Sequence, residues 1–177
     1  MSKTKVLCVV VVAFAVWPAS FVVGETITLK SDANTLAAVA TNVETGDTTG
    51  LTFSPAYVGA LGTVTPVPTG APVGTEVLNV SSGGSQSGYF KTTFTLPVGF
   101  SDAVIAGVAN VDDCGQVFLN GTPITPTPSP GNWGPIGQFS DGPFSANNQS
   151  LFIAGENVLL ISDIDYYSGG PCSTAQD

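Results

Sequence analysis

The chain has 177 residues, enough for one domain plus a leader, and only 10% are charged, against roughly a quarter in ordinary domains. It has no histidine and no arginine, and its four lysines face thirteen acidic residues. These counts exclude nucleic-acid binding through a basic patch, Ser-His and Cys-His catalytic dyads, and histidine metal sites.

Residues 1–24 are expected to be a targeting segment. Lys3 and Lys5 precede an apolar run from Val6 to Trp17, and small residues follow it. This order predicts a signal peptide, with a retained apolar N-terminal segment as the alternative. The run is too short for a comfortable membrane span, so we expect no stable span in the mature chain. Without residues 1–24, two lysines remain against thirteen acids, a net charge of −11.

The first part of the expected domain has few clear elements. Glu25 to Lys30 alternates apolar and polar residues and predicts the first strand. Residues 34–43 are rich in Ala and fit either a short helix or a strand. Residues 51–74 contain much Pro, Gly and Thr, which favours a long surface loop, and residues 76–80 fit a short strand.

Three strands are expected between Tyr89 and Gly121. Tyr89 to Leu96 alternates, with Phe90, Phe94 and Leu96 on one face and Lys91 and Thr93 on the other. Residues 104–111 and 116–119 are short apolar runs, and Asn120-Gly121 is a strong hairpin signal because both residues tolerate positive φ. These three strands predict half of an antiparallel β-sandwich.

The last part of the chain alternates loops and one strand. Alternating prolines in residues 122–130 forbid ladder hydrogen bonds and predict an extended polyproline-like loop. Gly155-Glu156-Asn157 is expected to be a tight turn before a strand over residues 158–164.

The order of these motifs resembles the galactose-binding-domain-like jelly roll, which occurs in accessory domains of glycoside hydrolases and in bacterial secreted proteins. The resemblance covers about residues 26–171 and implies an all-β fold, an antiparallel β-sandwich of jelly-roll type, over residues 25–177. It is weakly specific for function, because this fold hosts lectins, enzyme appendages and structural modules alike. The matching residues are Tyr89, Phe90, Lys91, Phe94, Leu96, Pro97, Asp112, Asp113, Gly115, Val117, Leu119, Asn120, Gly121, Trp133, Phe139, Leu151, Gly155, Glu156, Asn157 and Val158.

Two cysteines remain after the leader, Cys114 and Cys172. Two cysteines in an exported chain usually pair, so we expect a disulfide between them, with two free thiols as the alternative. In the chain-entropy model a loop of this length stabilises the fold by roughly 3–4 kcal/mol.

The carboxylates and aromatic residues are ambiguous. The resemblance implies that Asp112 and Asp113 organise the turn before the next strand, and the alternatives are a structural calcium site or, less favoured, catalysis. Trp133, Tyr166 and Tyr167 fit a sugar platform, although for Trp133 a plug in the core is favoured. No other cofactor is expected.

Glycosylation is a further expectation. Asn79, Asn120 and Asn148 each begin an Asn-X-Ser/Thr triplet, and Asn120 is expected to be structural because it sits in the hairpin turn. Thr125 and Thr127 in the Thr/Pro tract are candidate O-glycan carriers.

The composition favours a non-enzymatic protein, secreted and located outside the cell or on its surface. The first hypothesis is a structural subunit that forms a homo-oligomer, helical filament or surface layer. In the resembled family a further apolar strand follows the Gly-Gly-Pro turn, whereas here Gly169-Gly170-Pro171 is followed only by CSTAQD, so the resemblance implies that the sandwich is one strand short. A segment donated by another copy, Phe21 to Leu29 or the apolar run before it, is expected to complete the sandwich. The alternative is that the first strand of the same chain, or a rearranged edge, fills the gap. The second hypothesis is a carbohydrate-binding module that recognises glycans.

Overall fold

The protein folds into antiparallel β-sheets. The computed structural model describes residues 8–9, 27–41, 43, 45–58, 78–79, 86–111, 114–125, 136–137 and 142–164. Within these residues the regular elements are strands and one 3₁₀ turn, with no α-helix, and all pairings between the strands are antiparallel. The elements are β1 (Cys8–Val9), β2 (Leu36–Val39), β3 (Ser54–Pro55), β4 (Tyr57–Val58), β5 (Leu78–Asn79), β6 (Gly88–Leu96), β7 (Ile105–Asn110), β8 (Cys114–Gly115), β9 (Val117–Leu119), β10 (Thr122–Pro123), β11 (Ile136–Gly137), β12 (Gly142–Ala146), η1 (Gln149–Leu151) and β13 (Gly155–Asp163).

The larger sheet is built on the two longest strands, β6 and β13. Its order is β10-β9-β13-β6-β2-β3, and Gly155 to Asp163 pair in sequence with Leu96 to Gly88. The alternation predicted for β6 is present: Phe94 and Leu96 are buried, whereas Thr93 and Thr95 are exposed. A strand with this pattern buries one face against a second layer.

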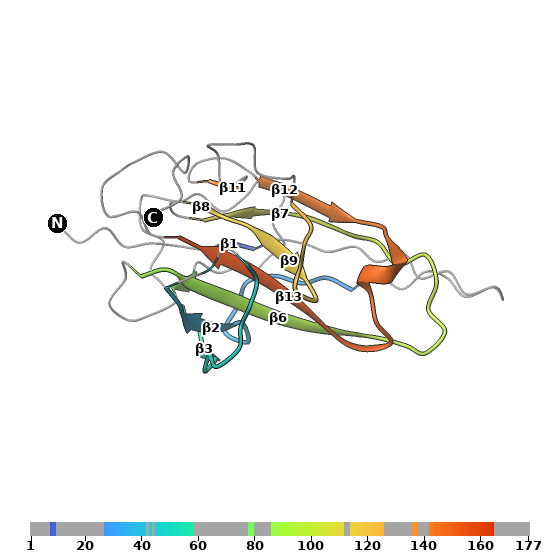
Figure 1. Ribbon diagram of the computed structural model, residues 1–177, viewed down its shortest axis with the longest axis horizontal. Coiled ribbons are helices and arrows are strands. Elements are labelled where there is room, and N and C mark those ends of the chain that lie inside the picture. Colours follow the sequence, from blue (N-terminus) through green and yellow to red (C-terminus); the bar gives the residue numbers. More distant parts are fainter. Residues whose placement is uncertain are drawn as a thin grey trace.

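A smaller sheet with the order β1-β7-β12 supplies that second layer. The five residues of β12 pair with Ala109 to Ile105 of β7, and their burial alternates. Figure 1 shows the two layers stacked, with β7 and β12 over β6 and β13. The class is therefore all-β with antiparallel sheets, an arrangement compatible with a β-sandwich.

The main core lies between the layers. Phe90, Phe94 and Leu96 of β6 belong to one buried cluster with Ile105 of β7 and Phe144 of β12. Because the two sheets contribute facing apolar surfaces, their packing supplies the main driving force for this fold.

A second, smaller cluster covers the opposite face of β6, which explains why Tyr89 is also buried. Tyr89 and Phe118 meet edge to face, with ring centroids 6.4 Å apart and an interplanar angle of 73°. The Tyr89 hydroxyl accepts a 3.1 Å hydrogen bond from the Gly46 backbone N–H. Gly46 has a φ of +69°, and a Cβ there would lie 2.7 Å from Phe118 Cδ1, so this close approach requires glycine.

The hairpin signal is confirmed. Thr122 pairs with Leu119, and the two residues between them, Asn120 and Gly121, have φ values of +50° and +80°. Positive φ at both central positions matches the right-handed twist of the flanking strands, as in a type I′ turn.

Some expectations for the local structure were wrong, and the choice left open for residues 34–43 falls on the strand. The strand expected over Glu25 to Lys30 is not found in its described part, because residues 27–30 join no ladder. The ambiguous segment 34–43 contains a strand, β2, and two short strands, β3 and β4, interrupt the expected loop over 51–74. Thr122–Pro123 form β10, an edge strand that proline tolerates.

The three strands of Tyr89 to Gly121 do not form one sheet. β6 and β9 belong to the larger sheet, whereas β7 crosses into the smaller one. A strand's sheet depends on distant partners such as β12 and β13, which local alternation does not reveal.

Candidate functional site

The β6 edge is paired along only part of its length. One edge is covered over all nine residues by β13. On the other edge β2 pairs with Gly88 to Lys91. Among the residues that the structure describes, no strand pairs with this edge from Thr92 to Leu96. Sheet edges of this kind present backbone donors and acceptors to an incoming strand.

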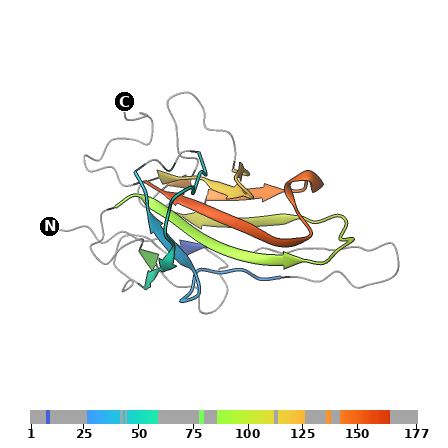
Figure 2. The ribbon, with the colours of Figure 1, turned by 60° about the horizontal axis from the view of Figure 1, so that its bottom comes forward.

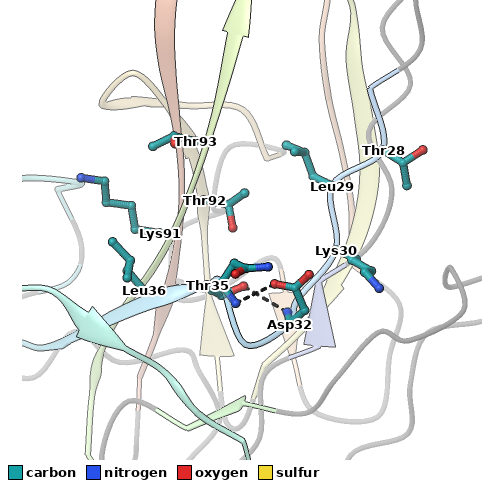
Figure 3. A pocket seen from close by; sticks show the side chains of 10 residues that line it. Thr28, Leu29, Lys30, Asp32, Thr35, Leu36, Lys91, Thr92 and Thr93 are labelled. Atoms are coloured by element: carbon teal, nitrogen blue, oxygen red, sulfur yellow. Dashed lines mark hydrogen bonds between the residues drawn. The ribbon is translucent and has the colours of Figure 1, made fainter.

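A groove of about 280 Å³ lies beside this edge. Figure 3 shows Lys91, Thr92 and Thr93 of β6 on one wall and Thr28, Leu29 and Lys30 on the other. The groove thus exists because residues 27–30 run apart from β6 before the chain returns as β2. The full lining is Thr28, Leu29, Lys30, Asp32, Asn34, Thr35, Leu36, Lys91, Thr92 and Thr93.

A local turn closes one end of the groove and feeds the chain into β2. Thr35 N–H donates to the Asp32 carbonyl at 2.9 Å, and Asp32 N–H donates to Thr35 Oγ1 at 3.2 Å. The Asp32 carboxylate accepts a 2.8 Å hydrogen bond from the Asn34 backbone N–H. Asp and Thr side chains commonly set such turns by bonding to nearby backbone, so the sequence D-A-N-T dictates where the chain reverses.

Two lysine side chains line the groove. Lys30 and Lys91 both line it, and they are the two lysines of residues 25–177. Figure 3 shows their side chains extending in opposite directions from Asp32. Lys91 Nζ lies 5.2 Å from the centroid of the Phe53 ring, a cation–π distance. The rims of the groove therefore carry the two positive charges of residues 25–177, where the other charged residues are acidic.

Leu29 gives the groove an apolar wall. It is 8% exposed and belongs to the main core cluster, with Ile27 packed against that cluster. The groove therefore combines an apolar wall, threonine hydroxyls and a partly unpaired strand edge. This set of groups suits an extended peptide, and its hydroxyl and amide groups also suit a sugar.

Two hydrogen-bonded amide side chains, those of Asn120 and Asn157, connect the β9–β10 hairpin to β13. Asn157 is fully buried, and its Oδ1 accepts from Asn120 Nδ2 and from Ile153 N–H, each at 2.9 Å. Its Nδ2 donates to the carbonyls of Ile153 at 2.8 Å and Gly155 at 3.1 Å. Asn120 in turn accepts from Val158 N–H at 2.9 Å. This network fixes the β9–β10 hairpin to the start of β13.

The structure describes Cys114 but does not test its predicted pairing. Cys114 is fully buried and its sulfur is disulfide-bonded. Cys172 lies outside the described residues, and for Cys8 only the position on β1 is described. The Cys114–Cys172 bridge therefore stays a prediction.

The predicted glycosylation positions fall in different surroundings. Asn148 is exposed, and its Oδ1 accepts from Ser150 N–H at 3.1 Å and from the Ser150 hydroxyl at 3.0 Å. Thr125 is 8% exposed. Asn79 lies on β5 opposite Tyr57, and its side chain is outside the description. Modification at each position remains a prediction.

The other predicted site residues lie outside the described residues, so their roles stay predictions: Asp112, Asp113, Thr127, Trp133, Tyr166 and Tyr167.

Among the described residues there is no group of three metal-ligating side chains. Hydrogen bonds from Thr49 hold the pKa of the exposed Asp47 carboxyl below its usual value. In the described part of the chain, no helix is both long and apolar enough to cross a membrane.

Sequence reasoning missed the groove. Asp32-Ala33-Asn34-Thr35 carries a turn signal that could have marked the chain reversal, but the expected strand at residues 25–30 concealed it.

No family model, curated protein or solved structure matches the chain. The functional argument therefore depends on this molecule alone.

Proposed function

We propose that this chain is a non-enzymatic extracellular structural subunit, built on a jelly roll of the galactose-binding-domain-like type, that assembles into a fibre or surface layer by strand donation. The observation that carries the proposal is the half-paired edge of β6 beside a groove. A strand from a second copy entering there would satisfy backbone groups and place alternate side chains against the apolar wall.

The charges favour a second copy as the partner. Lys30 and Lys91 flank the groove together with Asp32, while thirteen acidic residues against four lysines give every other copy a net negative charge. A cationic groove on one copy is therefore complementary to the acidic surface of the next. Complementary potentials mainly set specificity and the rate of encounter.

Head-to-tail donation also explains why the product would be a polymer. The groove and the donated segment are different surfaces of the same chain, so the contact is heterologous. Heterologous contacts that do not close into a ring generate helical filaments.

A carbohydrate-binding module is the second candidate, and the lining of the groove favours it. Hydroxyl and amide groups from Asn34, Thr35 and Thr92 lie beside Leu29 and Leu36. Sugar sites combine a few polar groups with an apolar surface in this way.

A double charge reversal separates these functions. Lys30→Glu/Lys91→Glu should abolish or strongly slow assembly, because both rims of the groove would then repel the acidic partner. Acidic substitutions at the exposed Val98 and Ile153, outside the groove, are the matched control and should assemble as the parent does. Sedimentation and electron microscopy measure assembly, and a glycan array measures sugar binding. A monomeric parent that binds glycans would replace the proposed function with the carbohydrate-binding one.

A further inference from the structure

The β9–β10 hairpin turns on a chemically reactive dipeptide. Asn120-Gly121 is the one Asn-Gly pair in the sequence. Such a pair deamidates readily in water, because glycine has no side chain to hinder its backbone nitrogen as it approaches the preceding amide. Asn120 is half-buried and Gly121 is exposed, so water reaches the turn.

The reaction needs no reagent other than water. The backbone nitrogen of Gly121 forms a bond to Asn120 Cγ, the bond from Cγ to Nδ2 breaks, and the proton of the Gly121 N–H leaves with Nδ2 as ammonia. Water then opens the resulting succinimide ring at either carbonyl, which gives aspartate or isoaspartate at position 120.

The folded hairpin engages each polar atom of the Asn120 side chain. Nδ2 donates to the Leu151 carbonyl at 2.8 Å and to Asn157 Oδ1 at 2.9 Å, which uses both of its hydrogens. Oδ1 accepts from Val158 N–H at 2.9 Å and so holds the amide against β13. In both ribbon views β13 lies between β9 and β6, so this anchor is the centre of the larger sheet (Figures 1 and 2).

These contacts oppose the reaction. Both hydrogen bonds of Nδ2 must break before the nitrogen can leave, and the third must break if the side chain is to turn toward the Gly121 nitrogen. At about a fivefold factor for each bond, the closed network should slow deamidation by about 25- to 125-fold.

The product cannot restore the same contacts. An ionised carboxylate has no donor hydrogen, so an oxygen would face the Leu151 carbonyl and Asn157 Oδ1, which are both acceptors. Asn157 cannot compensate by rotating its amide, because its own Oδ1 and Nδ2 are bonded to the N–H and carbonyl of Ile153. Isoaspartate also lengthens the backbone within the turn.

We propose that Asn120 is a self-modification site controlled by the fold. The closed amide network protects it, whereas opening the hairpin allows conversion to aspartate or isoaspartate, which prevents the hairpin from docking on β13 again. The reaction involves the chain and water alone, so it is independent of assembly and of any ligand.

Peptide mapping of the full chain measures the reaction. The protein is incubated at mildly alkaline pH, in buffer and in a urea concentration that unfolds it, and peptides with asparagine, aspartate or isoaspartate at position 120 are quantified over time. Conversion should be about 25- to 125-fold faster in urea than in buffer. The exposed Asn34 and Asn148, which precede larger residues, should convert slowly in both. Equal rates at position 120 in buffer and urea, or no conversion in urea, would overturn the proposal.

Two substitutions at one position separate the amide network from general stability. Asn157→Ala removes an acceptor of Asn120 Nδ2, so the folded variant should convert in buffer about fivefold faster than the parent. Asn157→Asp loses the hydrogen bonds donated to Ile153 and Gly155 but keeps the acceptor, so it should convert at the parent rate. Equal acceleration in both variants would show that global unfolding controls the reaction and would overturn the protective role of the network.

Asn120→Asp tests the effect of the modification, because it carries the product side chain from the start. It should unfold at a lower urea concentration than the parent, since both bonds donated by Nδ2 are lost. An unchanged midpoint would show that the modified hairpin still docks on β13, against the proposal.

Discussion

Replacing Asn157 by Ala should be among the most damaging single polar substitutions in the larger sheet. The side chain is fully buried and makes four hydrogen bonds, to Asn120, Gly155 and both backbone groups of Ile153. At about 1 kcal/mol net for each bond, and with the N–H of Ile153 left without its acceptor, the free energy of unfolding should fall by about 2–4 kcal/mol.

The loss should be visible in ordinary melting experiments. For a domain of this size about 3 kcal/mol corresponds to a Tm decrease of about 6–12 °C. Urea denaturation with an unchanged m-value would show that the native state lost stability without a change in the denatured state.

Two further variants make the test specific. Asn157→Asp keeps the shape but loses the two donated hydrogen bonds, so it should also destabilise. Asn148→Ala removes an exposed amide that caps a single 3₁₀ turn and should cost no more than about 1 kcal/mol. If Asn157→Ala unfolded at the same urea concentration as the parent, the amide network would not be holding the hairpin to β13.

Three other outcomes are expected. Gly46→Ala should destabilise the protein by about 1–3 kcal/mol in urea melts, because the new Cβ meets Phe118 and the backbone has positive φ; an unchanged midpoint would contradict this packing. Non-reducing peptide mapping should find Cys114 joined to Cys172, and a bridge to Cys8 or free thiols would show that this pairing is wrong. In a host that glycosylates Asn-X-Ser triplets, Asn148→Gln should remove one glycan mass from the intact protein, since its side chain is exposed; an unchanged mass would show that the position is unmodified.

Much of the strand pattern could be predicted from local sequence. The alternation in Tyr89 to Leu96 identified β6, and Asn120-Gly121 identified the hairpin, because each signal depends on neighbouring residues. The strand expected over residues 158–164 was also found, although β13 begins earlier, at Gly155.

What could not be predicted depends on contacts between distant residues. Residues 27–30 alternate as a strand would, yet Thr28 to Lys30 line the groove opposite Lys91 to Thr93, because the chain joins β6 only after the turn at Asp32, as β2. Likewise nothing local to β7 shows that it pairs with β12 in the other sheet. The groove is a consequence of both arrangements, so no single sequence motif marked it.

A density map of the assembled protein at side-chain resolution tests the central claim most directly. Strand donation predicts that a segment of one copy pairs with the next copy beside Thr92–Leu96 of β6. A map of isolated particles, or of assemblies in which both sheets are completed within each chain and no segment crosses between subunits, would contradict it.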